Sequence, residues 1–166
     1  MKKEILTIRH KDIMQRLFLH SYYRGEAHKT AGMPKHFSAG IQASESDSDM
    51  LENHISTAIT ECVKLLSRYF AVCSVKKIDE NESRITELHL QPPCNFPRES
   101  LSQMEQCIGN YIVMRTLQQW LAQHKPDDSL LAAEEVKSST IDIRETASLR
   151  KRPCRTAHKS NKSIEL

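Results

Sequence analysis

Glycine and aromatic residues are both scarce in this sequence of 166 residues. Gly occurs four times, and Phe, Trp and Tyr together make up 5% of the chain. Few glycines argue against an all-β fold, because such a fold needs many tight turns. A hydrophobic fraction of 39% beside 27% charged residues is typical of a soluble domain that is large enough to bury a core. The composition therefore favours one helical domain.

The sequence also lacks the motifs that most enzyme and cofactor sites require. It contains no P-loop, no dinucleotide-binding glycine motif and no nucleophile elbow. Its eight histidines are dispersed without a metal-ligand spacing, so we interpret them as surface or capping residues. The acidic run at 44–49 lacks the spacing and the glycine of a calcium-binding loop. We therefore expect no enzyme activity, no cofactor and no metal.

The cysteines and the apolar segments indicate the compartment in which the protein is made. The five cysteines are odd in number and no two are closely spaced, which argues against a zinc site and against a disulfide framework. The basic first ten residues carry no apolar segment of a signal peptide, and no apolar run approaches the length of a membrane span. We expect a protein that is made and assembled in a reducing cytoplasm and does not enter a membrane.

The segment 49–70 predicts the helix around which the domain is organised. Its apolar residues recur with the 3.6-residue period of an amphipathic helix. They are Leu51, Ile55, Ala58, Ile59, Cys62, Val63, Leu66, Tyr69 and Phe70. Asp49 is expected to act as the N-cap, with Glu52 completing a capping box. Such a helix gains its stability by burying its apolar stripe against a partner.

The segment 98–124 predicts a second long helix, which is apolar on most of its circumference. A helix of this kind is buried on several sides. We expect Ile59 and Leu66 to meet Ile108 and Ile112 where the two helices cross. Pro126 is expected to end the helix.

The remaining segments predict shorter elements. An extended piece at 5–8 precedes a helix at 11–24, which Gly25 is expected to cap. The segment 26–48 has no clear pattern and is interpreted as a long loop. Two β-rich runs within 71–91 flank a polar turn and predict a hairpin.

A further helix is predicted from Asp127 to about Lys137, with Asp127, Asp128 and Ser129 as caps. Beyond it, residues 138–143 weaken the helical pattern and are compatible with extended structure. The predicted fold is therefore mainly α: a bundle of about four helices with a small β-hairpin insert and extended termini. We place the helical domain at 1–149 and a basic tail at 150–166.

The basic tail is the one segment with a signal for binding a partner. Its basic residues are Arg150, Lys151, Arg152, Arg155, Lys159 and Lys162. With Glu165 as its only acidic residue, the tail carries +5, which leaves −2 for the rest of a chain of net charge +3. It could bind phosphates, dock on another protein or be a solvated tail. Pro153 and Cys154 interrupt its charge, and arginine suits paired contacts with carboxylates, so we hypothesise that it binds a neighbouring subunit.

Three segments together carry a family resemblance. The acidic, capped segment SDSDMLENHISTAITECVKLLSRYF is followed by a helix opening FPRESLSQMEQCIGNYIVMRTLQQWL and by the ending LRKRPCR. This order resembles the small helical head–tail connector (adaptor) proteins of tailed bacteriophages, and the ending is similar to the RKRP-type ending of small virion proteins. The resemblance covers residues 44–155, whereas the loop at 26–40 and the hairpin depart from it.

The resemblance implies a structural virion protein of the neck. Copies would form a ring between the portal protein and the tail-side neck proteins, with termini that reach neighbouring subunits and with DNA in a central channel. The alternative is a small nucleic-acid-binding or regulatory module that uses the basic tail. That module would present a recognition helix lined with Arg, Lys, Asn or Gln, whereas residues 98–124 contain only two arginines. We favour the adaptor.

Overall fold

The computed structural model describes residues 3–30, 43, 45–80 and 83–151 of the chain. It is mainly helical and contains one small antiparallel sheet, as the sequence predicts. The elements in chain order are β1 (Glu4–Arg9), α1 (His10–Thr30), the 3-10 helix η1 (Glu45–Asp47), α3 (Ser48–Leu66), β2 (Ala71–Glu80), β3 (Ser83–Gln91), the 3-10 helix η2 (Arg98–Ser100), α4 (Leu101–His124) and α5 (Pro126–Ser148).

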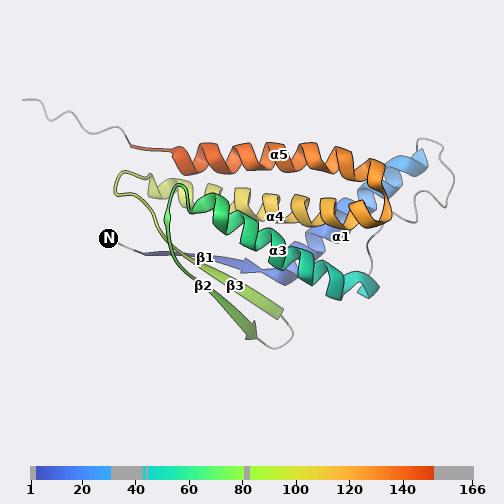
Figure 1. Ribbon diagram of the computed structural model, residues 1–166, viewed down its shortest axis with the longest axis horizontal. Coiled ribbons are helices and arrows are strands. Elements are labelled where there is room, and N and C mark those ends of the chain that lie inside the picture. The colour runs from blue at the N-terminus through green and yellow to red at the C-terminus, as the bar shows by residue number, and fades with distance from the viewer. Residues whose placement is uncertain (1–2, 31–42, 44, 81–82, 152–166) are drawn as a thin grey trace, which may run out of the picture.

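Helix α4 lies at the centre of the helical layers. The outermost helix, α5, runs along one side of it, α3 lies on the other side, and α1 crosses behind it (Figure 1). The three strands lie beyond α3, on the side away from α5 (Figure 1). This arrangement confirms that the second predicted long helix is buried on several sides.

The core is one continuous cluster of buried side chains from both sheet and helices. The four residues that were predicted to meet at the helix crossing, Ile59, Leu66, Ile108 and Ile112, all belong to it. Tyr111 and Trp120 are buried in the same cluster, which agrees with their interpretation as core residues. The two long amphipathic patterns therefore identified the centre of the fold.

The predicted hairpin is present and is extended to three strands by the N-terminal segment. The strand order is β1-β3-β2, and both neighbouring pairs are antiparallel. Leu6 of β1 pairs with Leu88 of β3, and Ile8 pairs with Thr86. All four side chains are buried, because alternate residues of these strands face the helices.

A buried histidine joins the sheet to α3. The side chain of His10 is 3% exposed, with Nδ1 2.7 Å from Oε2 of Glu52 and Nε2 3.0 Å from Oγ1 of Thr86. His10 is thus neither a surface nor a capping residue, which corrects its interpretation from sequence. Glu52 reaches His10 instead of forming the predicted capping box. Asp47 holds the N-cap position of α3 without a side-chain cap bond, and Asp49 lies within the first turn.

Two helices are longer than the sequence predicted. Helix α1 does not end at Gly25, which is buried inside it, but continues to Thr30. The long loop expected at 26–48 is correspondingly shorter, and residues 31–42 and 44 lie outside the described residues. Arg24 pairs with Glu135 of α5 at 2.6 Å, so tertiary contacts support the last turns of α1.

Helix α5 begins at Pro126 and continues to Ser148, which excludes the extended structure considered for 138–143. Ser139 and Thr140 donate hydrogen bonds to the carbonyls of Glu135 and Val136, four residues earlier. Ile143 is fully buried and holds this half of the helix in the core. Among the predicted caps, Ser129 instead donates to the carbonyl of Gln118 in α4.

An ion pair joins α3 to α4 at the edge of the core. Arg115 donates from Nε to Oε2 of Glu61 at 2.7 Å and from Nη2 to Oε1 at 2.9 Å. Tyr111 also donates to Oε2, at 3.3 Å. The hydrogen bond from Arg115 is the main reason why the pKa of Glu61 is lowered from its ordinary value of 4.5. Burial raises the pKa of Tyr111 to about 12, so its hydroxyl stays a donor.

We expect Ile59→Ala or Ile108→Ala to lower the free energy of unfolding by about 2–5 kcal/mol, because each leaves a cavity in the core. Chemical denaturation of the purified protein measures the change. Gln123→Ala, at an exposed residue of α4, is the control and is expected to change it by less than about 0.5 kcal/mol. An unchanged unfolding midpoint for both isoleucine variants would contradict the proposed pairing of α3 with α4.

We expect Glu61→Gln to lower the free energy of unfolding by about 1 kcal/mol at pH 7. Because the pKa of Glu61 is lowered in the folded state, its contribution is present above its ordinary pKa of 4.5 and is lost as the pH falls through the folded value. The difference between wild type and variant should therefore shrink below about pH 4.5. Urea titrations at several pH values measure it, and a constant difference down to pH 3 would contradict this assignment.

Candidate functional site

The structure describes only the first two residues of the predicted partner-binding set. Arg150 and Lys151 are described, whereas Arg152, Arg155, Lys159 and Lys162 lie outside the described residues. Arg150 donates from Nη1 to the carbonyls of Ala147 and Leu149, at 2.8 and 2.7 Å. It therefore satisfies carbonyls at the C-terminal end of α5, where a positive charge is favourable.

Lys151 fixes the point at which the basic tail leaves the domain. Its backbone N–H donates to the carbonyl of Asn95 at 2.7 Å, and its ammonium lies 3.2 Å from Oε2 of Glu99. The ion pair is exposed and contributes little stability by itself. Together with the backbone bond, however, it holds the start of the tail against the loop and 3-10 helix that precede α4.

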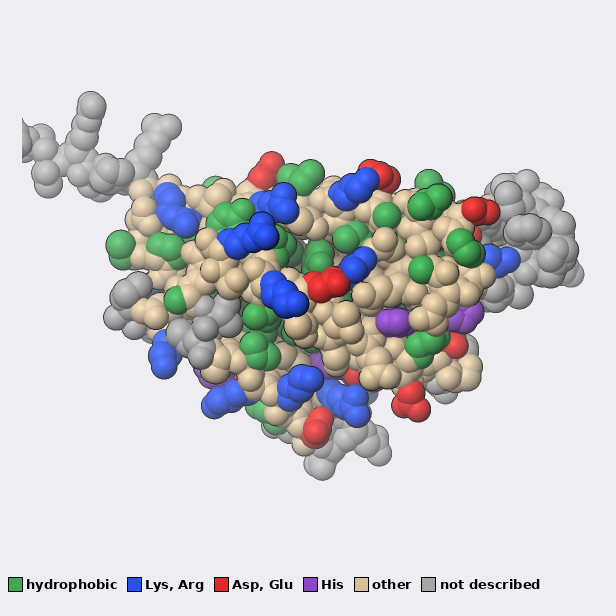
Figure 2. Space-filling model, in the orientation of Figure 1, with side chains coloured by type: hydrophobic (Ala, Val, Ile, Leu, Met, Phe, Trp, Pro, Cys, Tyr) green, Lys and Arg blue, Asp and Glu red, His purple; other side chains and the backbone are tan. Residues whose placement is uncertain are grey.

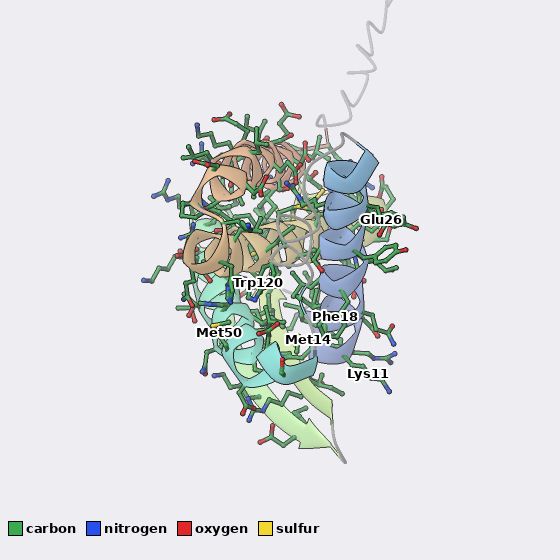
Figure 3. All side chains as sticks on the ribbon, turned by 90° about the vertical axis from the view of Figure 1, so that its right-hand side faces the viewer. Lys11, Met14, Phe18, Glu26, Met50 and Trp120 are labelled. Carbon is green, nitrogen blue, oxygen red and sulfur yellow. The ribbon has the colours of Figure 1, made fainter. Side chains whose placement is uncertain are left out.

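A polar cleft lies between α1, α4 and α5, away from the tail. It has a volume of about 650 Å³ and is lined by three helices. Helix α1 contributes Arg16, His20, Tyr23, Arg24 and Ala27; α4 contributes Asn110 and Met114; α5 contributes Glu135, Ser138 and Ser139. The two arginines and the histidine are spaced by four residues, which places them on one side of α1. Figure 3 views α1 from outside: Met14 and Phe18 point into the core, and Lys11 and Glu26 point away from it.

The two arginines of the cleft differ in their partners. Arg24 is neutralised by Glu135 across the cleft. Arg16 donates from Nη2 to the neutral amide oxygen of Asn110. A Cβ atom at Gly109 would lie 3.0 Å from Nη1 of Arg16, so the absence of a side chain at this position gives the guanidinium room beside α4.

The histidine of the cleft is held neutral. Burial is the main cause that lowers the pKa of His20, and the positive charge of Arg16 lowers it further. At pH 7 the neutral ring offers one donor and one acceptor to a bound group. The cleft therefore presents one arginine without a described carboxylate partner, one neutral imidazole and the hydroxyl of Ser138, whereas the hydroxyl of Ser139 already donates to the carbonyl of Glu135.

Large apolar side chains are exposed beside the cleft and along α5. On α1, Leu19, Tyr22 and Tyr23 are at least half exposed at a spacing that places them side by side. On α5, Leu130, Leu131 and Ile141 are 71%, 63% and 51% exposed. Figure 2 shows hydrophobic side chains among charged ones along the upper edge of the molecule, where α5 runs. Such surfaces are typical of protein contacts when they are extended.

Groups for covalent or metal chemistry are not assembled in the described part of the chain. Burial raises the pKa of the Cys62 thiol to about 12, so this cysteine is a core residue. Cys107 is half-buried and Cys94 is exposed. Within residues 3–30, 43, 45–80 and 83–151, no group of three or more His, Cys, Asp or Glu side chains is placed to hold a metal ion.

Sequence reasoning missed the cleft, although part of its signal was available. The spacing of Arg16, His20 and Arg24 by four residues marks one side of a helix. The spacing could not reveal the opposite wall. Ser138 and Ser139 belong to the segment in which the helical pattern was expected to weaken, and the pairing of Glu135 with Arg24 depends on how the helices pack. No helix among the described residues is both long and apolar enough to cross a bilayer.

No protein-family model matches this chain, and neither the curated proteins nor the solved structures contain a significant match to it.

We expect truncation after Lys151 to abolish ordered assembly and to leave weak binding to duplex DNA unchanged, because the tail is predicted to bind a neighbouring subunit. A second truncation after Leu149 also removes the contacts with Asn95 and Glu99. Comparing the two truncations distinguishes the role of these contacts from that of the residues that follow them. Analytical ultracentrifugation measures assembly, and DNA titration over a series of salt concentrations measures phosphate contacts. If the truncated protein assembles normally but the salt dependence of its DNA binding is lost, the tail binds nucleic acid instead.

Proposed function

We propose that this chain is a structural virion protein, a head-to-tail adaptor that forms a ring of copies between the portal and the tail of a bacteriophage. The neighbours in the ring are further copies of the chain, and the layers above and below are the portal protein and tail-side neck proteins. DNA would pass through the central channel without sequence-specific contacts.

The observation that carries this proposal is the outward face of α5. Leu130, Leu131 and Ile141 expose large aliphatic side chains on the outermost helix, and a subunit of an assembly could bury them against its neighbour. The core does not need these residues, since the inward face of α5 contributes Ala132, Ile143 and Ala147. The outward face is therefore available for a contact with another chain.

The size of this face explains why a terminal arm is needed. A helix of 23 residues is about 34 Å long and about 10 Å wide, so it offers roughly 350 Å² to a neighbour. A stable interface takes about 800 Å² from each partner. The 15 residues after Lys151 can span up to about 50 Å when extended, which is enough to reach across a neighbouring subunit.

The anchored start of the tail supports the same function. Because Lys151 is bound to Asn95 and Glu99, the tail leaves every copy from the same place. A fixed point of departure directs an arm to a defined site on the next subunit, which suits a closed ring. A tail that gathers DNA through charge alone needs no such anchor.

We expect the double variant Leu130→Ser and Ile141→Ser to remain folded but to shift the protein from an assembled to a monomeric state. Burial of these side chains at an interface contributes about 1–2 kcal/mol each, and the loss is repeated at every interface of the ring. Native mass spectrometry and sedimentation velocity measure the state, and thermal unfolding shows that the fold is retained. Val75→Ser, at an exposed apolar residue of β2, is the matched control.

Two results would contradict the adaptor. The first is a double variant that assembles like the wild type. The second is a wild-type protein that stays monomeric at all concentrations and binds duplex DNA with a steep dependence on salt, which would favour the nucleic-acid module.

A further inference from the structure

The polar cleft between α1, α4 and α5 contains a positive charge that no described carboxylate neutralises. Arg16 is one of its lining residues, and the described hydrogen-bond partner of Arg16 is the neutral side chain of Asn110. A partly buried cation gains from a negative partner much more than from an amide, because hydrogen bonds between ions are about twice as strong. The carboxylate nearest to the cleft, Glu135, is already paired with Arg24 at 2.6 Å.

The remaining lining of the cleft is amphipathic. Tyr23 is 66% exposed, and Met114 and Ala27 add apolar surface next to the polar groups. Leu19 and Tyr22 continue this apolar surface along α1, outside the cleft. The cleft can therefore accept an apolar side chain beside an anionic one.

The ligand class follows from the same residues. A volume of about 650 Å³ is that of a site for a small ligand or a short peptide segment. Glu135 also lines the cleft and would repel a run of phosphates, which favours a ligand with a single carboxylate. Single-stranded nucleic acid would need a continuous basic groove with stacking aromatic residues, and the cleft offers one uncompensated arginine and one tyrosine.

We propose that this cleft binds a carboxylate-bearing, partly apolar segment of another protein, with Arg16 pairing with the carboxylate, Ser138 donating a hydrogen bond, and Tyr23 covering an apolar side chain. This site goes beyond the proposed ring, because α1 and α4 contribute most of its lining and neither the tail nor Leu130 and Ile141 of α5 belong to it. Gly109 belongs to the site, since it leaves the space in which the guanidinium lies.

The pKa of His20 can be used to detect a ligand bound in the cleft. Burial and the charge of Arg16 keep its pKa low in the empty cleft. A carboxylate bound to Arg16 neutralises part of this positive field, so the pKa of His20 should rise on binding. The shift is measured from the ring proton signals of His20 by NMR during a pH titration.

The test uses the full chain and a blocked pentapeptide of sequence Gln-Leu-Asp-Gln-Leu, with a Gln-Leu-Asn-Gln-Leu peptide as its matched control. Calorimetry is expected to show binding of the acidic peptide only. Arg16→Ala should raise its dissociation constant about tenfold or more, and Arg16→Lys should restore part of the affinity. Arg144→Ala removes an exposed arginine of α5 outside the cleft and should change nothing.

Further measurements distinguish a protein carboxylate from inorganic phosphate and from nucleic acid as the ligand of the cleft. The proposal would be overturned if inorganic phosphate bound as tightly as the peptide and if replacing Leu by Gly in the peptide did not lower its affinity. These results would show a site for small anions. Duplex DNA whose binding depends on Arg16 would overturn it in favour of nucleic acid. Failure of the acidic peptide to bind, or binding that leaves the pKa of His20 unchanged, would also overturn it. The oligomeric state of Arg16→Ala is followed in parallel, because α5 variants that assemble like the wild type while peptide binding stays intact reject the adaptor alone.

Discussion

The fold depends on the burial of α4 from three sides. Residues of this helix such as Ile108, Ile112 and Leu117 are almost completely removed from solvent. Each fully buried aliphatic side chain contributes about 1.5–3 kcal/mol, so this one helix supplies a large part of the hydrophobic free energy. Helices α1, α3 and α5 pack on its different sides, and the sheet is attached to this group through α1, His10 and Glu52. A change in the core of α4 therefore affects every layer of the molecule.

The elements that the sequence could predict are those in which burial alone determines the pattern. Ile59 and Ile108 follow an apolar period and were placed correctly in the core. Thr86, Leu88 and Leu90 alternate along β3 and are all buried, as the period of a strand allows. Each of these residues is apolar or small, and each repeats at the period of its element, so local pattern and tertiary environment agree.

The ends of the helices and the polar contacts could not be predicted in this way. Gly25 is a common helix terminator, but here it is buried within α1, whose last turns are held by Arg24 and Glu135. The β-branched and hydroxyl-rich segment after Lys137 remains helical because Ile143 is buried and Ser139 donates to a carbonyl four residues earlier. The continuation of α1 past Gly25 depends on a helix more than 100 residues away, and that of α5 past Lys137 depends on burial against a neighbouring layer. Neither can be read from the segment alone. The cleft was missed for the same reason: its walls come from three helices.

The attachment of α5 to the rest of the domain connects the fold with the proposed assembly. Most of its buried residues are small, including Ala132, Ser139 and Ala147, which allows the helix to approach α4 closely. Small side chains remove little apolar area from water, so the inward face contributes less free energy per residue than that of α4. The larger aliphatic residues of α5, Leu130 and Ile141, face outward instead. In a ring these residues would be buried by the next subunit, and α5 would then gain from its neighbour much of the stabilisation that its own domain does not supply.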